Sequence, residues 1–382
     1  MTVPEADAVS PTAGDSGSER VTRLVGPDVV RAVALIGVVV MNYHGYLILR
    51  GAPRGDGWLD QLFDPWEGPL STRFAATFVL TAGIAVTLLT RRVVADRAAG
   101  RSGADAAVVE MRWRLVRRGL TLYVLGQFLD VIWPGTIIVY YGAMFVLAAG
   151  LFTLRTGWLV AAGSSAALAG WAISVWSSQR VLDGGDVGWL VAPGGDSIRR
   201  YAFDLFVNGT HPLAPWMAFF CAGIVLGRCL DRPRWRVVAA STGSALVMAA
   251  GVLSTFASTE LQEVVLSVHP FDRGLLYTAS ALGTALLATA IISETADRLA
   301  VRRPATVDPL RRAGQMSLTI YVAHILVFNL VVDWLGWIEP SGVGTSLGFA
   351  FGFWVVAIIA ATSWHRRFGR GPLERVYRHL GG

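Results

Sequence analysis

The sequence contains no lysine and only two cysteines, Cys221 and Cys229, among its 382 residues. All 33 basic residues are therefore arginine, and we interpret this usage as a GC-rich bacterial coding bias. The two cysteines lie in one apolar segment, about 12 Å apart along a helix, which is too far for a disulfide bond. The sequence therefore has no disulfide framework. We also expect no metal site, because no cysteine or histidine spacing matches one.

Charged residues are scarce as well. They make up 16% of the chain, and hydrophobic residues make up 53%, whereas an ordinary soluble domain is about 25% charged. This composition indicates an integral membrane protein, whose first partner is the lipid bilayer. The net charge of +6 does not indicate a nucleic-acid partner, because the arginine clusters lie between apolar segments, where they set membrane topology.

Several common motifs are also absent. The N-terminus is polar, acidic and rich in serine, glycine and proline, without the apolar core of a signal peptide. We expect residues 1–23 to form a disordered cytoplasmic tail. The chain has no P-loop and no Gly-x-Ser-x-Gly nucleophile elbow. The sequence predicts one transmembrane domain over residues 24–365 and a basic cytoplasmic tail over residues 366–382.

Long apolar runs mark the expected membrane spans, each about 20 residues in length. The runs lie at residues 28–49, 71–90, 118–133, 136–154, 157–177, 211–228, 236–256, 273–293, 317–337 and 345–364. The sequence thus predicts an all-α, polytopic membrane bundle with about ten transmembrane helices. No sustained internal repeat is visible, which argues against an inverted-repeat transporter.

Arginine is concentrated in alternate connections between these runs. The Arg-rich connections are residues 91–118, 228–236 and 294–314, together with the C-terminal tail. The longest Arg-poorer connections are residues 50–70 and 178–210, and we expect the second, which is rich in glycine, to be an irregular loop. By the positive-inside rule, the Arg-rich connections and both termini are expected in the cytoplasm, with the protein in the bacterial cytoplasmic membrane.

The first run carries polar residues at both ends. Asn42 follows Arg31 at a spacing close to three helical turns, so the two share one face about 16 Å apart along the axis. Arg31 either pairs with Asp28 or meets an anionic ligand such as a phosphate. Asn42 hydrogen-bonds either a neighbouring helix or a reacting group. His44 lies about 220° around the helix from Arg31, but a histidine there is suited to accept a proton or an acyl group.

The second and third runs also contain polar residues, which we assign to a substrate site. Arg73 either reaches the outer interface or contributes to that site. Tyr123, Gln127 and Asp130 share one helical face, which we interpret as facing a cavity, with helix–helix hydrogen bonding as the alternative. Tyr140 follows the tight Trp-Pro-Gly turn after this stripe and is assigned to the same site.

Two further histidines are candidates. His211 opens the sixth run at the outer mouth, where it is either an interfacial residue without a task or a catalytic group. Ser317, Tyr321 and His324 share one face of the ninth run, and His324 is expected near mid-membrane. A histidine at that depth must face protein or a cavity, and we favour a functional cavity.

Five segments resemble the transmembrane acyltransferase superfamily, in particular its branch of heparan-α-glucosaminide N-acetyltransferase and YeiB-like bacterial proteins. In this branch an arginine in the first helix is followed eleven positions later by asparagine, as Asn42 follows Arg31 here. The segments are GPDVVRAVALIGVVVMNYH, STRFAATFVLTAGIAVTLLTRR, HPLAPWMAFFCAGIVLGR, GQMSLTIYVAHILV and FGRGPLERVYR. They are spread over most of the chain, and their order carries the resemblance.

The resemblance implies an all-helical membrane enzyme with acyl-CoA as co-substrate. Such enzymes take acyl-CoA from the cytoplasm and deliver the acyl group, here expected to be acetyl, to an acceptor such as a cell-envelope glycan on the outer side. The resemblance places Arg31, with Asp28, on the side where CoA binds. We expect Tyr321 and His324 to line the tunnel between the two sides.

The same resemblance places Asn42 at the reacting centre but leaves the catalytic histidine open. The acetyltransferase carries its histidine farther into the first outer loop than His44, and this loop contains no later histidine. His44 and His211 are therefore alternatives for a general base or a transient acyl carrier. A transporter or flippase of a polar or lipid-linked metabolite is the rival function, and a homodimer is among the assemblies the chain could form.

Overall fold

The computed structural model describes residues 25–191 and 197–382, and within these ranges every regular element is a helix. The disordered tail expected over residues 1–23 lies outside the described residues. The first helix, α1 (Val25–Ile48), carries Gly26 and Pro27 in its first turn. It ends before Gly51, whose φ of 96° is readily adopted only by glycine.

Seven long helices make up most of the described chain. They are α1, α3 (Arg73–Ala98), α4 (Ala104–Asp130), α6 (Thr156–Leu182), α10 (Trp235–Ser254), α12 (Leu275–Arg302) and α15 (Val343–Phe368). Helices of intermediate length are α5 (Ile137–Leu151), α9 (Leu213–Gly227), α13 (Pro304–Gln315), α14 (Ser317–Phe328) and α16 (Pro372–Gly381). The short elements are α2 (Trp58–Phe63), α7 (Gly188–Val191), α8 (Ile198–Phe203), η1 (Asp204–Asn208), α11 (Glu260–Val265), η2 (Pro270–Asp272) and η3 (Asn329–Trp334).

Each of the ten predicted runs lies on a helix, so the expected all-α fold is confirmed for the described residues, and the apolar helices fit a membrane protein. Seven helical segments of the described chain are long and apolar enough to cross a membrane. They are α1, α3, α6, α10, α12, α15 and the segment Ser317–Trp334, which joins α14 and η3. The number is eight if the pair Ile198–Asn208 and Leu213–Gly227, bent by 54°, forms one span. Two of the expected spans fall on α4 and α5, which are not among them. The first half of α4 is rich in charge, and α5 has only 15 residues.

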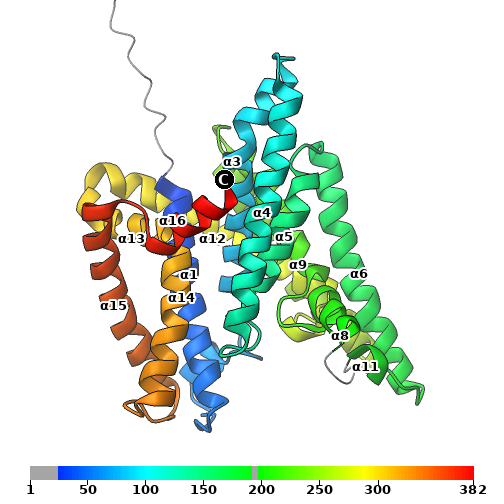
Figure 1. The fold of residues 1–382 in the computed structure, drawn as a ribbon. Helices are drawn as coiled ribbons and strands as arrows, with labels where there is room; N and C mark the ends of the chain where they lie inside the picture. The colour runs from blue at the N-terminus through cyan, green and yellow to red at the C-terminus, as the bar shows by residue number, and fades with distance from the viewer. Residues whose placement is uncertain (1–24, 192–196) are drawn as a thin grey trace, which may run out of the picture.

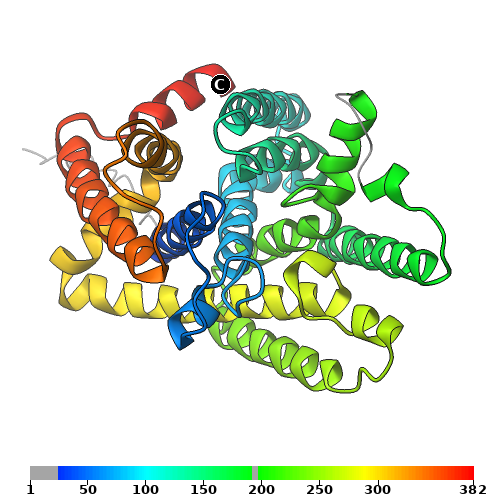
Figure 2. The same cartoon turned by 90° about the horizontal axis from the view of Figure 1, so that it is seen from below.

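The helices pack around α1, which contacts α3, α12, α13, α14 and α15 (Figures 1 and 2). Further closely packed pairs are α4 with α5, α6 with α9, and α10 with α12. Helix α16 runs across one end of the bundle and joins α14 to α4 (Figure 1). We call this the Arg-rich end, because it also holds α13 and the α3–α4 turn, and we call the opposite end, with the α4–α5 turn, the far end.

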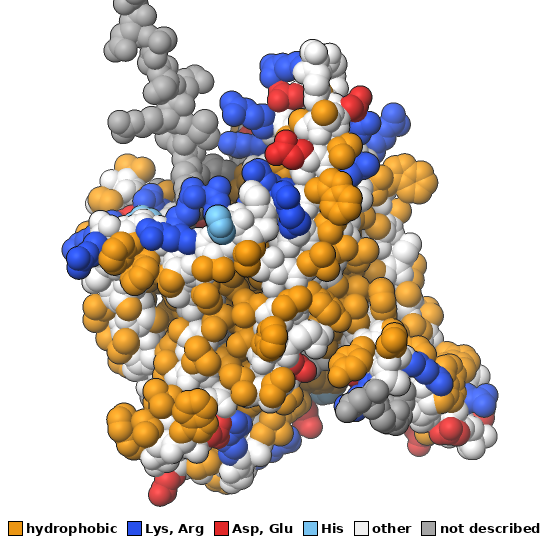
Figure 3. Space-filling model, in the orientation of Figure 1, with side chains coloured by type: hydrophobic (Ala, Val, Ile, Leu, Met, Phe, Trp, Pro, Cys, Tyr) orange, Lys and Arg blue, Asp and Glu red, His pale blue; other side chains and the backbone are white. Residues whose placement is uncertain are grey.

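The surface agrees with a membrane-embedded bundle. On the face shown in Figure 3, hydrophobic side chains cover the middle of the molecule and arginines gather along the Arg-rich end. A wide apolar groove of about 750 Å³ runs between α14 and α15, lined by small residues such as Gly348, Gly352 and Ala360. Apolar surface of this extent is normal for side chains that face lipid.

The connection at residues 178–210 is more regular than expected. Helix α6 continues through its first residues to Leu182, and the short helices α7, α8 and η1 follow. The side chain of Ser197 caps α8 by accepting a hydrogen bond from the Arg200 backbone N–H at 3.2 Å. The glycine content suggested a loop, but helix capping and tertiary packing override such local signals.

Helices α3 and α9 touch at their backbones. A Cβ atom on Gly83 would lie 2.2 Å from the Phe220 carbonyl oxygen, and one on Gly223 would lie 2.1 Å from the Leu80 carbonyl oxygen. Neither oxygen belongs to a flexible side chain, so any larger residue must push the helices apart. Small residues at a helix crossing allow this close approach, which favours association within a bilayer.

We expect Gly223→Ala to destabilise the fold by about 1–3 kcal/mol, because the added methyl group overpacks a backbone contact. The matched control is Gly251→Ala on α10, where a Cβ atom would meet no atom within 4 Å. That change should be neutral or slightly stabilising, since alanine favours helix over glycine. Unfolding temperatures of the purified variants in detergent measure both effects, and equal temperatures for Gly223→Ala and the wild type would contradict the crossing.

Candidate functional site

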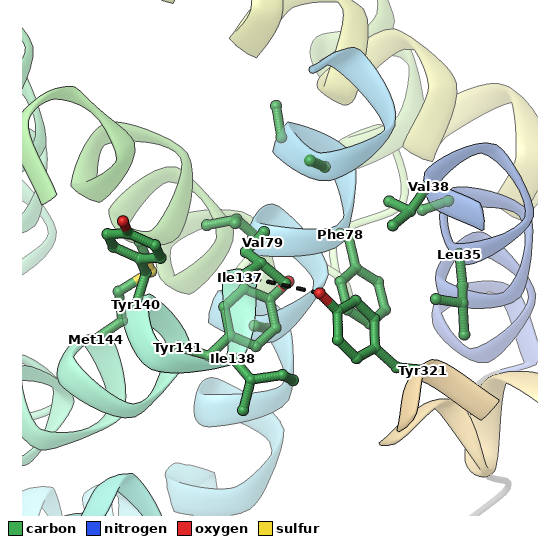
Figure 4. Close-up of a cluster of buried hydrophobic side chains, with 14 of the residues drawn as sticks. Leu35, Val38, Phe78, Val79, Ile137, Ile138, Tyr140, Tyr141, Met144 and Tyr321 are labelled. Atoms are coloured by element: carbon green, nitrogen blue, oxygen red, sulfur yellow. Dashed lines mark hydrogen bonds between the residues drawn. The ribbon is translucent and has the colours of Figure 1, made fainter. Parts of the chain in front are cut away.

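Two cavities lie inside the bundle, and Tyr321 of α14 lines both of them. The cavity toward the Arg-rich end has a volume of about 390 Å³, and we call it the basic cavity. The cavity toward the far end has a volume of about 240 Å³, and we call it the far cavity. Figure 4 shows Tyr321 reaching toward α5, where its hydroxyl accepts a hydrogen bond from the Ile137 backbone N–H at 3.3 Å. This side chain therefore lies between the two cavities.

The basic cavity takes its name from its arginines. Arg31, Arg118, Arg370 and Arg378 line it, together with one carboxylate, Glu374. Arg31 makes a loose contact with Asp28, with 3.8 Å between Nη1 and Oδ1. Asp28 also accepts a hydrogen bond at 2.8 Å from the Gln315 amide.

The carboxylate of Glu374 is hydrogen-bonded to the first turn of α14. Its Oε1 accepts hydrogen bonds from the backbone N–H groups of Leu318 at 2.8 Å and Thr319 at 3.1 Å. Its Oε2 accepts one from the Thr319 hydroxyl at 2.5 Å. A carboxylate at a helix N-terminus is stabilised by the free N–H groups and the helix dipole. Glu374 thus holds α16 against α14. Since the basic cavity is lined by four arginines and by this one carboxylate, its electrostatic potential is positive.

The basic cavity also contains unsatisfied polar atoms. Arg118 Nε, the Tyr141 hydroxyl and the Tyr377 hydroxyl are buried and have no hydrogen-bond partner among the described residues. The Arg118 guanidinium stacks over the Tyr377 ring at 5.5 Å, and burial raises the pKa of Tyr377, so its hydroxyl remains protonated. Buried polar groups are almost always hydrogen-bonded in native structures. Three such groups around one cavity indicate space for a polar ligand.

In the far cavity the central residue is Asn42, which is held by His324. The His324 side chain is fully buried, and its Nδ1 contacts the Tyr321 carbonyl oxygen. Because a carbonyl only accepts, Nδ1 must carry the proton, and Nε2 of a neutral ring then accepts from Asn42 Nδ2 at 3.1 Å. The second N–H of the Asn42 side-chain amide and its Oδ1 are then available to a ligand in the far cavity.

His211 lines the far cavity with Asn42. Its ring packs against Trp216 at 4.5 Å and Tyr140 at 5.7 Å between centroids, and its buried Nδ1 has no hydrogen-bond partner in the part of the chain that the structure describes. Trp66 and Trp133 add aromatic surface to the same cavity. Asn42, His211 and Tyr321 therefore line one cavity.

Other candidates lie outside both cavities. His44 turns to α15, where its Nδ1 lies 3.1 Å from the Ser346 hydroxyl. Arg73 donates to the Ser280 hydroxyl at 2.9 Å and stacks over the Tyr277 ring at 5.4 Å.

The remaining three belong to the α4–α5 region. Asp130 accepts from the Gly135 N–H at 2.8 Å and so holds the α4–α5 turn. Tyr140 packs behind His211, and Gln127 lines neither cavity.

Sequence reasoning missed several residues of the basic cavity. Arg118, Arg370 and Arg378 belong to clusters that we interpreted only as topology signals. Tyr141 was passed over for Tyr140, although consecutive residues on a helix point about 100° apart. Figure 4 shows these two side chains diverging, with Tyr141 beside Phe78 at 5.5 Å between ring centroids. Among the described residues, no group of three histidine, cysteine or acidic side chains could hold a metal ion.

We expect the tyrosines of the basic cavity to respond differently to loss of their hydroxyl groups. Tyr321→Phe should lower stability by about 0.5–1.5 kcal/mol, because its hydroxyl bonds Thr136 Oγ1 at 3.1 Å and the Ile137 N–H. Tyr141→Phe should leave stability unchanged or higher, because its hydroxyl has no partner. Thermal unfolding of the ligand-free protein measures both, and a larger loss for Tyr141→Phe would refute the assignment.

Comparison with protein families finds a match in the C-terminal part of the chain. A family described as "Protein of unknown function (DUF418)" matches residues 216–381, which include α14 and α16 but not α1. Comparison with curated proteins gives no match. The family match fits a membrane protein family and does not distinguish a particular acyltransferase branch.

Proposed function

We propose that this protein is a membrane acyltransferase that moves an acyl group, expected to be acetyl, from acyl-CoA in the basic cavity to an acceptor in the far cavity. The observation that carries the proposal is that the two cavities meet at one side chain, Tyr321. The acceptor class is a cell-envelope glycan or a similar molecule. This role agrees with the resemblance to the heparan-α-glucosaminide N-acetyltransferase and YeiB-like branch.

The proposal includes an orientation. Under the positive-inside rule the Arg-rich end faces the cytoplasm, which supplies acyl-CoA, and both termini lie on that side of the bacterial cytoplasmic membrane. The far cavity then faces outward. With α4 and α5 included, the chain would cross the membrane about ten times.

The basic cavity suits the donor. Arg31, Arg118 and Arg378 provide guanidinium groups for the phosphates of CoA. Deeper in the cavity the walls are mostly apolar, with Phe78 and Ile138, and the Tyr141 hydroxyl is available to an amide of the pantetheine arm. The thioester would then lie beside Tyr321, whose side chain must turn aside to join the cavities.

The far cavity provides the groups for transfer. The acceptor's hydroxyl or amine attacks the thioester carbonyl, and its proton passes to the free Nδ1 of His211. The developing oxyanion accepts a hydrogen bond from the second N–H of Asn42, which His324 holds in place. The C–S bond breaks, and CoA leaves as a thiolate that takes up the proton held by His211, which restores the base. His44 is hydrogen-bonded to Ser346 and lines neither cavity, so we prefer His211 as the general base.

We expect Arg31→Gln to weaken acetyl-CoA binding by about tenfold or more, the usual effect of losing a charged hydrogen bond. Tyr141→Phe should weaken it less. Arg112→Gln on α4 is the matched control, because Arg112 is exposed and lies outside the basic cavity. Calorimetry on the purified protein measures these affinities. Absence of acetyl-CoA binding to the wild type, combined with metabolite transport in liposomes, would instead favour a transporter.

We expect Asn42→Ala to reduce acetyl transfer by about 100-fold to 1,000-fold, as loss of an oxyanion donor does. Its affinity for acetyl-CoA should change far less than its transfer rate, because Asn42 lies outside the basic cavity and Tyr43 still links α1 to α14 through the His324 carbonyl oxygen. His211→Gln should also lose transfer, whereas His44→Ala should retain it. Assays with acetyl-CoA and a glucosamine acceptor test this, and full activity in His211→Gln with none in His44→Ala would reverse the assignment.

A further inference from the structure

One exposed face of α4 changes from an aromatic and a basic residue to apolar residues along the helix. Trp113, Arg117, Leu120, Val124 and Phe128 follow helical spacing and lie within about 80° of one another around the axis. All are exposed, and Phe128 is 73% exposed. From the Arg-rich end inward the order is an aromatic ring, a cation and then apolar groups, which matches the interface and the hydrocarbon of a bilayer.

This face borders an apolar groove of about 510 Å³ beneath α16. Leu373, Val376 and Leu380 of α16 line its other side, and Val376 and Leu380 remain more than half exposed. No described side chain covers them. Because the groove is open and apolar and lies on a membrane-facing surface, a hydrocarbon chain is the group that fits it.

Arginines gather where the groove meets the Arg-rich end. A Cβ atom on Gly382 would lie 2.6 Å from Arg117 Nη2 and 3.7 Å from Arg114 Nε, so both guanidinium groups lie at the end of α16. Within the described ranges, neither forms a salt bridge with an acidic side chain. Arg375 of α16 is also exposed. The groove therefore has an apolar floor and a cationic rim.

We propose that this groove binds a phospholipid with an anionic headgroup. One acyl chain lies along Leu120, Val124 and Phe128, and the phosphate meets Arg117 and Arg114. Charge complementarity selects an acidic lipid over a zwitterionic one, since each basic residue near the surface adds about 1 kcal/mol of attraction. The proposal is independent of the acyltransferase function.

The bound lipid would also support the basic cavity. Leu122, Leu318 and Tyr377 line both the groove and the basic cavity, so these three side chains are the wall between them. A lipid chain against one side of this wall restricts the space into which Tyr377 and α16 could move. Because the headgroup charge decides which lipid occupies the groove, it also influences the shape of the basic cavity.

The test uses the full-length protein in nanodiscs that contain equal amounts of phosphatidylglycerol and phosphatidylcholine. After transfer to mild detergent, mass spectrometry counts the lipids that stay bound. The wild type should retain phosphatidylglycerol in excess. Arg117→Gln should lower the ratio of bound phosphatidylglycerol to phosphatidylcholine about fivefold, the equivalent of about 1 kcal/mol.

Two further variants make the result specific. Arg112→Gln removes the same charge from an exposed position on α4 outside the groove, and it should leave the ratio unchanged. Val124→Trp keeps every charge but fills the groove, and it should reduce retention of both lipids. The proposal is overturned if Arg112→Gln and Arg117→Gln lower the ratio equally, or if Val124→Trp retains lipid like the wild type.

Discussion

The hydrogen bond between Asn42 and His324 fixes the relation between α1 and α14, and the arrangement of both cavities depends on that relation. In a low-dielectric interior, an amide and an imidazole must each find a partner or pay a large desolvation cost. Tyr43 adds a second link by donating to the His324 carbonyl oxygen at 3.1 Å. Because Tyr321 lies one helical turn before His324, the same links aim its side chain between α1 and α5.

The basic cavity depends on a segment beyond the last membrane helix. Glu374 places α16 at the start of α14, and α16 then supplies Arg378 and Tyr377 as cavity wall. Arg118 on α4 meets this wall from the other side, where its Nη2 donates to the Gly382 carbonyl oxygen at 3.3 Å. Cavity charge is thus set by contacts between distant parts of the chain.

Features that depend on one helix could be read from the sequence. The helical spacing of Arg31 and Asn42 correctly put them on one side of α1, where each lines a cavity. The same arithmetic turned His44 away, and it lies against α15. The positions of the long apolar helices also followed from composition, since bilayer thickness fixes their length.

Features that depend on partners across helices could not be read in this way. Arg73, for example, hydrogen-bonds Ser280 on α12, a partner distant in the sequence that no spacing reveals. The role of Arg118 was hidden because a topology signal and a ligand-binding arginine look alike in one sequence.

The backbone contact at Gly83 and Gly223 has a mechanical consequence. The backbones touch there, and the Thr87 hydroxyl of α3 donates to the Ile224 carbonyl oxygen of α9 at 2.8 Å, so the two helices form a stiff support behind the cavities. Across the bundle, an apolar groove rather than interlocked side chains separates α14 from α15. Any opening that lets Tyr321 turn aside should therefore be a tilt of α14 against a stationary α3–α9 frame.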